Sequence, residues 1–245
     1  MFGPATRELL RSAGLSPGMN VVDIGCGSGL NSLWMAEVVG SRGHVTAADA
    51  SPDQLRIAEQ NAAQRGLRNI SFAVADACDT HLPRASFDLV YSRFLMCHLT
   101  QPSKAIDELR QLLKPGGLLV CEDFDSDSMY TDPPTPAYER LRSMVEITHR
   151  GRGADSRIGM KLHRLILDSG FPAPEIRITQ PAYFRGPEKL FWELSLREAA
   201  PGVLAAGVAT PHEIDSLCAE FRRIAEDDSI LLVFPRFFQV WARKP

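Results

Sequence analysis

The sequence predicts an α/β fold in which a parallel sheet is covered by helices. Short apolar runs alternate with segments of helical period through the first half of the 245-residue chain. A glycine-rich turn follows the first apolar run directly, and no break in composition separates one part of the chain from another. We therefore expect a single α/β domain with helical insertions in its second half.

The first half contains five predicted strands, at Asn20–Ile24, His44–Asp49, 69–75, 87–92 and 118–122. Helices are expected between them, at Leu30–Val39, after Ser51, and at 102–113. Ser51 is a suitable N-cap, since Pro52 can occupy the first helical position and Gln54 follows three residues after the cap. Gly66 would end that helix, and Lys-Pro-Gly-Gly at 114–117 would end the next.

The pattern changes after residue 123. Residues 124–136 are acidic and rich in proline, which predicts a loop. Helices are expected at 137–150 and 161–169, with two or three more inside 187–230. Strand-like alternation returns at Glu175–Thr179 and at Arg236–Arg243.

The composition is that of an ordinary globular protein, with 44% hydrophobic and 23% charged residues. A net charge of −3 argues against a wholly basic nucleic-acid binder, although it leaves room for a local basic patch. The five cysteines form no C-x-x-C pair, which favours free thiols in a reducing compartment and predicts no metal site. Arg7, Glu8 and Arg11 argue against a signal peptide, and no apolar run reaches the roughly 18–20 residues of a membrane span. We therefore expect a cytoplasmic protein.

The segment VVDIGCGSG, residues 21–29, is the most informative. Gly25, Gly27 and Gly29 give G-x-G-x-G between a strand and a helix, where glycine permits tight turning and close approach of a ligand. A dinucleotide fingerprint needs glycine where Leu30 stands, which argues against a nicotinamide enzyme. Asp23 would be unfavourable beside a pyrophosphate and suits a neutral or cationic ligand; equally, it could orient the turn by accepting hydrogen bonds from backbone amides.

Two further carboxylates follow predicted strands. Asp49 ends the second strand, where an acid can accept hydrogen bonds from both hydroxyls of a ribose. Asp76 lies just beyond the third strand and can accept from an exocyclic amine such as that of adenine. The glycine turn and these acids would meet at the carboxyl edge of the sheet, the usual ligand crevice of an open α/β fold.

Five segments resemble, in order and spacing, the class I S-adenosylmethionine-dependent methyltransferases: VVDIGCGSG, VTAADAS, FAVADA, FDLVYSRFLMCHL and LKPGGLLVCED. The resemblance covers residues 15–123 and points to the bacterial small-molecule branch that contains the ubiquinone/menaquinone-type enzymes. Residues 124–245 resemble that branch more loosely. The resemblance implies a Rossmann-like sheet of seven strands, mostly parallel, with one antiparallel strand at Arg236–Arg243.

The resemblance also implies S-adenosylmethionine as the cofactor. Gly25, Gly27 and Gly29 would pack against its methionyl and ribose parts, and Asp49 would hold the ribose hydroxyls. The other implied cofactor-binding residues are Asp23, Ala50, Asp76, Ala77, Ser92 and Arg93.

The chain is expected to divide into a core and a helical cover. The core would comprise residues 1–123, 170–182 and 234–245, and the cover, 124–169 and 183–233, would face the transferable methyl group. Relatives usually carry some tens of residues before the segment that matches 2–10. Here we expect that part of the cover to be short, and the site to be open or closed by a partner, such as the second subunit of a homodimer.

Methyl transfer from a sulfonium chiefly needs proximity and alignment, and it needs a general base only where the acceptor must first lose a proton. His98, just past the fourth strand, is the candidate base; it could also simply cap or pack the following helix. Candidate acceptor contacts, which could equally be core or surface residues, are Tyr130, Tyr138, His149, His163, Phe184 and Trp192.

We expect methyl transfer from S-adenosylmethionine to oxygen or nitrogen of a small organic molecule, such as a secondary metabolite. One alternative is an RNA or other nucleic-acid methyltransferase that uses residues 139–164, which contain seven basic and three acidic residues. That stretch could also be a solvated helix face. Ser92-Arg93-Phe94-Leu95 differs from the Asn/Asp-Pro-Pro-Tyr motif of enzymes that methylate base amino groups. A cofactor-binding protein without turnover is the other alternative.

Overall fold

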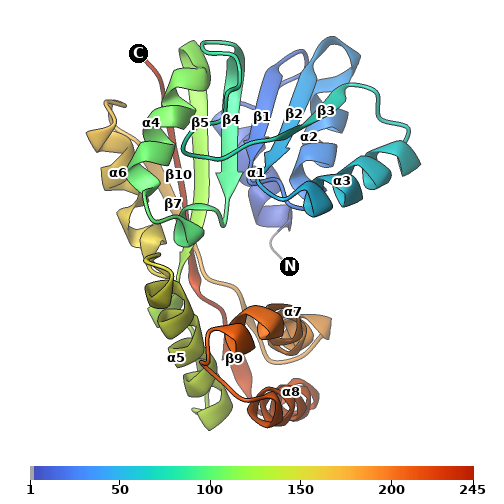
Figure 1. Cartoon of the computed structure of the whole chain (residues 1–245), viewed down its shortest axis with the longest axis vertical. Coiled ribbons are helices and arrows are strands. Elements are labelled where there is room, and N and C mark those ends of the chain that lie inside the picture. Colours follow the sequence, from blue (N-terminus) through green and yellow to red (C-terminus); the bar gives the residue numbers. More distant parts are fainter. Residues whose placement is uncertain (1–2) are drawn as a thin grey trace.

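The computed structural model describes residues 3–245, so Phe2 of the expected first segment lies outside the described residues. A seven-stranded sheet with the order β3-β2-β1-β4-β5-β10-β7 forms the centre (Figure 1). Its strands are β1 Asn20–Ile24, β2 His44–Asp49, β3 Ile70–Val74, β4 Phe87–Arg93, β5 Leu113–Asp125, β7 Glu175–Thr179 and β10 Arg236–Arg243. Since β10 is antiparallel to both of its neighbours and the first five strands are parallel, the predicted sheet is confirmed.

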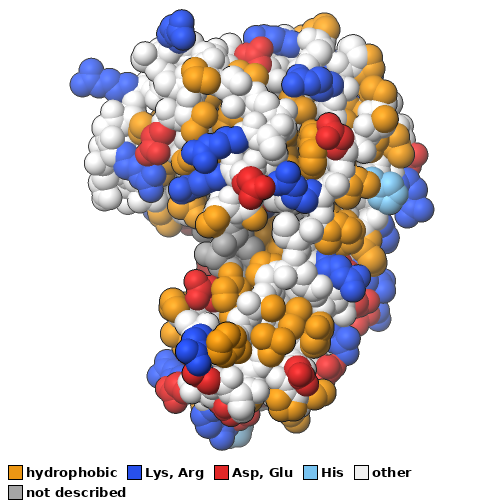
Figure 2. Space-filling model, turned by 180° about the vertical axis from the view of Figure 1, so that it is seen from behind, with side chains coloured by type: hydrophobic (Ala, Val, Ile, Leu, Met, Phe, Trp, Pro, Cys, Tyr) orange, Lys and Arg blue, Asp and Glu red, His pale blue; other side chains and the backbone are white. Residues whose placement is uncertain are grey.

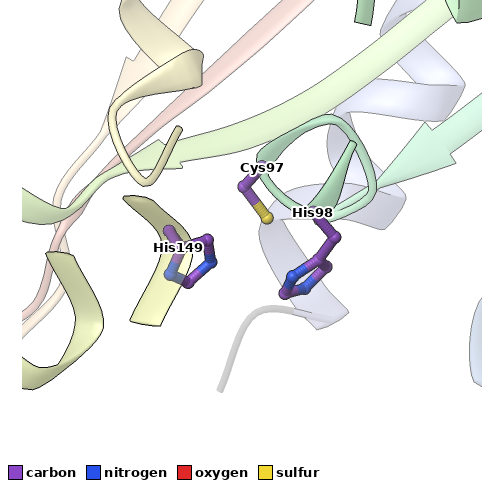
Figure 3. Close-up of side chains that lie close together, drawn as sticks. All are labelled: Cys97, His98 and His149. Carbon is purple, nitrogen blue, oxygen red and sulfur yellow. The ribbon is translucent and has the colours of Figure 1, made fainter. Parts of the chain in front are cut away.

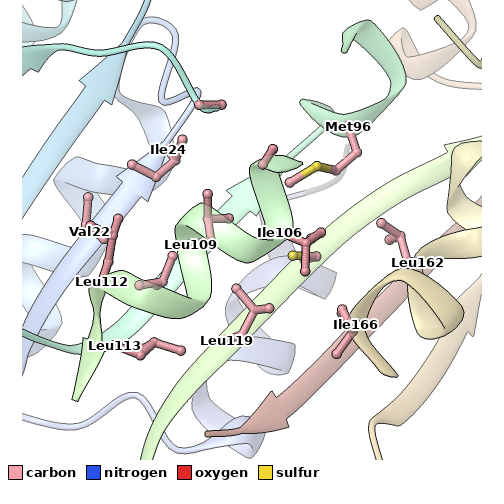
Figure 4. Close-up of a cluster of buried hydrophobic side chains, with 14 of the residues drawn as sticks. Val22, Ile24, Met96, Ile106, Leu109, Leu112, Leu113, Leu119, Leu162 and Ile166 are labelled. Atoms are coloured by element: carbon pink, nitrogen blue, oxygen red, sulfur yellow. The ribbon is translucent and has the colours of Figure 1, made fainter. Parts of the chain in front are cut away.

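Helices cover both faces of this sheet. The helices are α1 Gly3–Ala13, α2 Leu30–Val39, α3 Pro52–Gln64, α4 Pro102–Leu112, α5 Pro136–Gly151, α6 Leu162–Asp168, α7 Phe191–Ala205 and α8 Pro211–Glu226. On one face, Ile106 and Leu109 of α4 and Ile166 of α6 pack on strand residues such as Val22 and Leu119 (Figure 4). On the other face, α1 and α2 pack on the alternate residues of the same strands. This division follows from the alternation of side chains along a strand.

The helix starts follow the signals in the sequence. The Ser51 hydroxyl accepts a hydrogen bond from the Gln54 N–H at 3.4 Å, and Pro52 begins α3. Helix α1 is not among the helices expected from the sequence. Its Leu9 and Leu10 are fully buried, and its Thr6 hydroxyl donates to Glu122 of β5 at 3.2 Å.

A second hydrophobic core forms a helical lobe, made of α5, α7, α8 and a small sheet in the order β6-β9-β8. The strands of this sheet are β6 Tyr130–Asp132, β8 Ala182–Tyr183 and β9 Leu231–Val233. The parallel strands point toward the lobe, which lies beyond their carboxyl edge (Figure 1). From behind, the molecule is hollowed between the main sheet and the lobe (Figure 2).

Three expectations change. The Lys-Pro-Gly-Gly stretch lies inside β5 instead of preceding it, because Leu113 already pairs with Phe87 of β4. Residues 124–136 are only partly a loop, since β5 runs to Asp125 and β6 follows. Leu162 and Ile166 of α6 belong to the core of the main sheet, although the sequence assigns α6 to the cover.

Within residues 3–245, none of the helices has the combination of length and apolar character that crossing a lipid bilayer would demand.

Candidate active site

The glycine turn lies at the carboxyl end of β1. Gly25, Gly27 and Gly29 have φ of 75°, 53° and 82°, in the left-handed region that favours glycine. The N–H groups of Gly25 and Cys26 both donate to the carbonyl of Ala48, at 2.8 and 3.0 Å, which ties the turn to β2. A Cβ at Gly27 would meet only the Gln54 side chain, at 3.9 Å, so the space above the middle of the turn is open.

Asp49 holds this turn through its carboxylate. Its Oδ2 accepts the Gly27 N–H at 2.8 Å, and its Oδ1 accepts the Ser51 N–H at 2.9 Å. Each carboxylate oxygen has a second acceptor position, so Asp49 can still accept from two hydroxyls. Ala50, the next residue, is exposed. The half-buried Asp49 therefore lies where the sequence places a ribose contact.

Asp76 lies on the path that leaves the neighbouring strand. Asp49 pairs with Val74 of β3, and Asp76 follows two residues later as an exposed side chain. Its Oδ1 accepts the Cys78 N–H at 2.7 Å, which fixes the carboxylate. Ala77 is buried in the sheet core. A carboxylate has further acceptor positions, so Asp76 can still accept a hydrogen bond from an amine.

Asp23 is 2% exposed and lies within β1. Its Oδ2 accepts the hydroxyl hydrogen of Ser32 at 2.6 Å, so it joins β1 to α2. Burial raises the pKa of Asp23 to about 6, and the hydrogen bond from Ser32 only partly opposes that effect. This partner differs from the turn amides that the sequence analysis considered, and a cofactor contact for Asp23 stays a prediction.

Ser92 and Arg93 end β4 beside the turn, because Ser92 pairs with Ile24. Ser92 is buried and its hydroxyl approaches the Cys121 sulfur at 3.5 Å. The Arg93 guanidinium donates to the Thr6 hydroxyl at 3.3 Å and is therefore held by α1. Arg93 is half-buried and supplies positive charge at this edge of the sheet.

Glu122, behind Arg93, is the centre of a buried network. Its carboxylate accepts hydrogen bonds from Tyr91 at 2.6 Å, Gln239 at 2.6 Å and Thr6 at 3.2 Å. Three donors compensate for the burial of this acid. The network fixes α1, β4, β5 and β10 to one another below the site.

The loop after β4 connects the glycine turn with a separate cavity. A Cβ added at Gly25 would lie 3.0 Å from Leu95, so this loop packs directly against the turn. The following turn, Met96–His98, buries Met96 and Cys97. The Cys97 N–H donates to Asp123 at 3.1 Å, which fixes the position of His98.

His98 and His149 line that cavity, whose volume is about 560 Å³. The lining is mainly apolar and aromatic: Phe94, Phe124, Met129, Val145, Phe191, Trp192, Ala199, Pro235 and Phe237, with Ser126, Ser195 and Glu198 as further polar members. An adjoining cavity of about 370 Å³ shares both histidines and adds Thr148 and Arg152. The wall therefore suits a ligand that is mostly apolar and carries a few polar atoms.

The two imidazole rings stack, with centroids 5.3 Å apart and planes 20° apart (Figure 3). Desolvation lowers the pKa of His98 to about 4, with His149 and Arg152 as smaller contributors. Part of the His98 side chain remains open to solvent, so water screens some of this effect. Desolvation also lowers the pKa of His149. Both rings are therefore neutral at pH 7.

Asp123 is fully buried behind the loop. Its carboxylate accepts the N–H groups of Cys97 and Phe124, at 3.1 and 2.9 Å. Burial raises the pKa of Asp123 to about 7, even though these hydrogen bonds lower it. The acid is thus enclosed by protein and contacts the backbone of Phe124, which lines the cavity.

The structure brings together only some of the predicted acceptor contacts. His149 and Trp192 line the cavity with His98. Tyr138 lies behind Trp192 and accepts its indole N–H at 2.6 Å. Tyr130 and Phe184 are 51% and 47% exposed on the outside of the lobe. His163 is in α6, which packs on the main sheet; it, Tyr130 and Phe184 are absent from the residues that line either cavity.

The basic stretch at 139–164 is largely neutralised by acids. Five of its seven basic residues form ion pairs: Arg140, Arg142, Arg150, Arg157 and Lys161. One acid partner, Glu213, comes from α8, far away in the sequence. This pattern favours the interpretation as a solvated helix face over phosphate binding.

Sequence reasoning missed the apolar wall from Phe94, Phe124 and Phe237, and the proximity of Cys97 to the two histidines. Phe237 lies in β10, where the alternation of apolar and polar residues predicts that it is buried. The alternation does not indicate in which of the two hydrophobic cores it is buried. Cys97 carries no spacing signal, because the second histidine of the cluster, His149, comes from α5, some fifty residues later.

Comparison with known proteins adds independent findings. Residues 15–150 match the family described as a methyltransferase domain. The demethylmenaquinone methyltransferase of Listeria monocytogenes serotype 4a (strain HCC23) is 32% identical over 117 residues, which cover 48% of this chain and 49% of that protein. Phosphoethanolamine N-methyltransferase 1 of Arabidopsis thaliana is 30% identical over 167 residues, 68% of this chain and 31% of that protein. The chain thus spans about half the length, or less, of these relatives.

Solved structures share the fold. A putative methyltransferase from Bacillus halodurans C-125 superposes with a TM-score of 0.68 at 18% identity and covers 99% of this chain and 100% of that one. Phosphoethanolamine N-methyltransferase 2 of Haemonchus contortus, in complex with phosphomonomethylethanolamine and S-adenosylhomocysteine, gives a TM-score of 0.66 at 19% identity. That match covers 99% of this chain and 53% of the other.

Proposed function

The chain belongs to the class I S-adenosylmethionine-dependent methyltransferase family, and from this premise we propose that it methylates an oxygen or nitrogen atom of a small, largely apolar molecule. S-Adenosylmethionine, when bound, supplies an electrophilic methyl group on a sulfonium. The chain has two tasks: to hold this cofactor at the carboxyl edge of the sheet, and to present the acceptor to it without water.

The residues at the sheet edge fit the cofactor. The turn leaves open space above Gly27, and Asp49 retains acceptor positions beside it. Asp76 and Ala77 are suited to the adenine, while Arg93 is suited to the carboxylate end of the methionyl part. Gly25 and Gly29 shape the turn and leave Gly27 as the residue closest to the ligand.

One observation carries the proposal for the acceptor: the loop that packs on the glycine turn through Leu95 also delivers His98 to the aromatic cavity. A ligand in this cavity therefore lies next to the cofactor crevice. Enclosure between the main sheet and the lobe excludes water from the reacting atoms. The apolar lining supports planar phenols, hydroquinones or aromatic amines as acceptors over strongly polar ones.

We propose that His98 acts as the general base, as expected from the sequence. Its neutral ring can accept the hydrogen bond, and then the proton, of an acceptor hydroxyl. A weak base suffices because the acceptor hydroxyl becomes strongly acidic as its oxygen forms the bond to the methyl group, so its proton then passes to the ring. The His149 ring stacks on the His98 ring and holds its orientation. Two uncharged rings at this wall favour an uncharged acceptor.

Calorimetry with S-adenosylhomocysteine tests the cofactor half. Asp49→Ala removes two charge-assisted hydrogen bonds, each worth roughly 1.5–3 kcal/mol, so we expect at least a tenfold loss of affinity. Asp53→Ala, on the exposed start of α3, serves as the matched control and should bind normally. Thermal unfolding checks that Asp49→Ala is folded, since Asp49 also holds the turn. Unchanged affinity in Asp49→Ala, or tight binding of NAD by the wild type, would contradict the proposal.

Release of S-adenosylhomocysteine tests the acceptor half. We expect turnover with a panel of phenols, hydroquinones and aromatic amines, and little with phosphoethanolamine. Preference for phosphoethanolamine would show that the apolar cavity is not the acceptor site.

A further inference from the structure

Three side chains with metal-binding atoms converge beside the aromatic cavity: Cys97, His98 and His149 (Figure 3). The two histidines line that cavity. The sulfur and one nitrogen of each ring lie within 4.8 Å of one another. Cys97 and His98 come from the turn after β4 in the core, and His149 comes from α5 in the lobe. The cluster therefore joins the two hydrophobic cores.

His149 is prepared to bind through one nitrogen. Its Nδ1 lies 2.8 Å from the carbonyl of Val145, which can only accept, so Nδ1 carries the hydrogen. The Nε2 lone pair is then free, and this buried atom has no hydrogen-bond partner among the described residues. Metal-ligating histidines show the same arrangement, with the second nitrogen donating to a backbone carbonyl.

Cys97 and His98 complete a soft donor set. Cys97 is fully buried, so its thiol is shielded from oxidants in solvent and faces the ring nitrogens. The Asp123 carboxylate, which accepts the Cys97 N–H, fixes this residue from behind. Thiolate and imidazole together suit Zn²⁺ and related borderline metals, and do not suit Mg²⁺ or Ca²⁺.

We propose that Cys97, His98 and His149 bind a divalent transition metal of the Zn²⁺ type, with a fourth position open to the aromatic cavity. Bond lengths of about 2.3 Å to sulfur and 2.0–2.1 Å to nitrogen place tetrahedral donors roughly 3.3–3.7 Å apart. Metal binding therefore requires the exposed His98 ring to rotate out of its stack until the donors reach these distances. When the metal–sulfur bond forms, the Cys97 S–H bond breaks and its proton passes to solvent or to Asp123; nothing is oxidised or reduced.

That the three residues bind a metal does not depend on methyl transfer. The role of the bound metal in catalysis rests on the proposed function. With metal bound, His98 is a ligand, and the open position of the ion would bind and acidify an acceptor hydroxyl in place of the histidine base. The ion would also fasten α5 to the turn after β4, and so stabilise the lobe against the main sheet.

Cobalt binding tests the site directly. Wild-type protein freed of metal by a chelator should take up one equivalent of Co²⁺ and show thiolate-to-cobalt charge-transfer absorption, which Zn²⁺ then abolishes. Calorimetry should give one Zn²⁺ per chain, and Zn²⁺ should raise the thermal unfolding temperature. Cys97→Ser and His149→Gln should each weaken Zn²⁺ binding at least tenfold, and Cys97→Ser should lose the charge-transfer band.

Matched controls separate this site from chance binding by the other thiols and imidazoles. Cys218→Ser changes another buried cysteine, in α8, and His163→Gln changes a histidine in α6; both should bind Zn²⁺ as the wild type does. Unfolding of the metal-free variants shows whether each is folded; if Cys97→Ser is not, the half-buried His149→Gln decides.

Two results would overturn the proposal: a wild type with no charge-transfer band and no stoichiometric Zn²⁺ binding, or binding that persists in His149→Gln. S-Adenosylhomocysteine binding to the same metal-free protein is measured in parallel. Its loss would count against the proposed function, whereas loss of metal binding alone would count only against the metal site.

Discussion

Asp23 is a buried acid beside the glycine turn, and its burial lowers the stability of the folded protein when the acid is ionised. It is an acid inside a central strand, held by Ser32 and otherwise surrounded by protein. Burial without a cation in contact disfavours the charged form, so its pKa is about 6 in place of the ordinary 3.8. The folded protein therefore binds a proton at Asp23 between about pH 4 and pH 6, where the unfolded chain has already lost it.

This difference makes a pH-dependent prediction. In that window the free energy of unfolding falls as pH rises, because the folded state holds more protons at Asp23. Asp23→Asn removes the titration, so its stability relative to the wild type should rise by roughly 2–3 kcal/mol from pH 4 to pH 7. Urea unfolding of both proteins across this range measures it, and Asp123 and the histidines cancel in the comparison.

Asp53→Asn is the control for the Asp-to-Asn change itself, since Asp53 is an exposed surface residue. A flat difference for Asp23→Asn would mean that Asp23 titrates as an ordinary acid.

The turn from β1 into α2 is the element on which the cofactor crevice depends. Its last glycine, Gly29, has φ of 82° at the N-cap of α2 and touches α3. A Cβ there would lie 2.9 Å from the Cβ of Ala58, a distance too short for two carbon atoms. Gly29 thus permits both the left-handed backbone and the close approach of α2 to α3.

Gly29→Ala and Gly66→Ala separate these two requirements. Both glycines have positive φ, 82° and 66°, but a Cβ at Gly66, which ends α3, meets nothing within 4 Å. Gly66→Ala should lose about 1–2 kcal/mol from backbone strain alone, whereas Gly29→Ala should lose a further 1–3 kcal/mol from overpacking. Denaturant unfolding measures both. Adding Ala58→Gly to Gly29→Ala should restore part of the loss; equal losses in the two single variants would show that the helices adjust freely.

At the scale of the whole molecule, two hydrophobic cores enclose the cavity between them. The main sheet supplies Phe94 and His98, and the lobe supplies Phe191 and Trp192. Trp192 stacks on Phe234 and donates to Tyr138, so it is fixed from the lobe side. In the proposed function, therefore, the cofactor binds to the main sheet and the acceptor binds to the lobe.

Trp192→Ala tests this division. It should reduce methyl transfer at least tenfold through poorer acceptor positioning, while S-adenosylhomocysteine affinity changes less than twofold. Phe184→Ala, an aromatic residue of the same lobe outside the cavity, should leave both quantities unchanged. Kinetics and calorimetry on the two variants decide it. A matching loss of cofactor affinity in Trp192→Ala would place that residue in the cofactor site instead.

The amino-acid pattern alone predicts the seven strands of the main sheet, the glycine turn, and the acids at the ends of β2 and β3, but none of the three strands of the small sheet. Asn20–Ile24 and His44–Asp49 are correct to the residue, since their burial pattern and flanking turn residues are local properties of the chain. The family resemblance then determined the sheet, including antiparallel β10. Only the tertiary structure decided which side chains meet in the cavity. Tyr130 and Phe184 point outward while Phe237 and Cys97 point inward, because contacts between distant segments depend on how two separate cores pack. His98 and His149 stack for the same reason: α5 reaches the turn after β4 only when the lobe docks on the sheet.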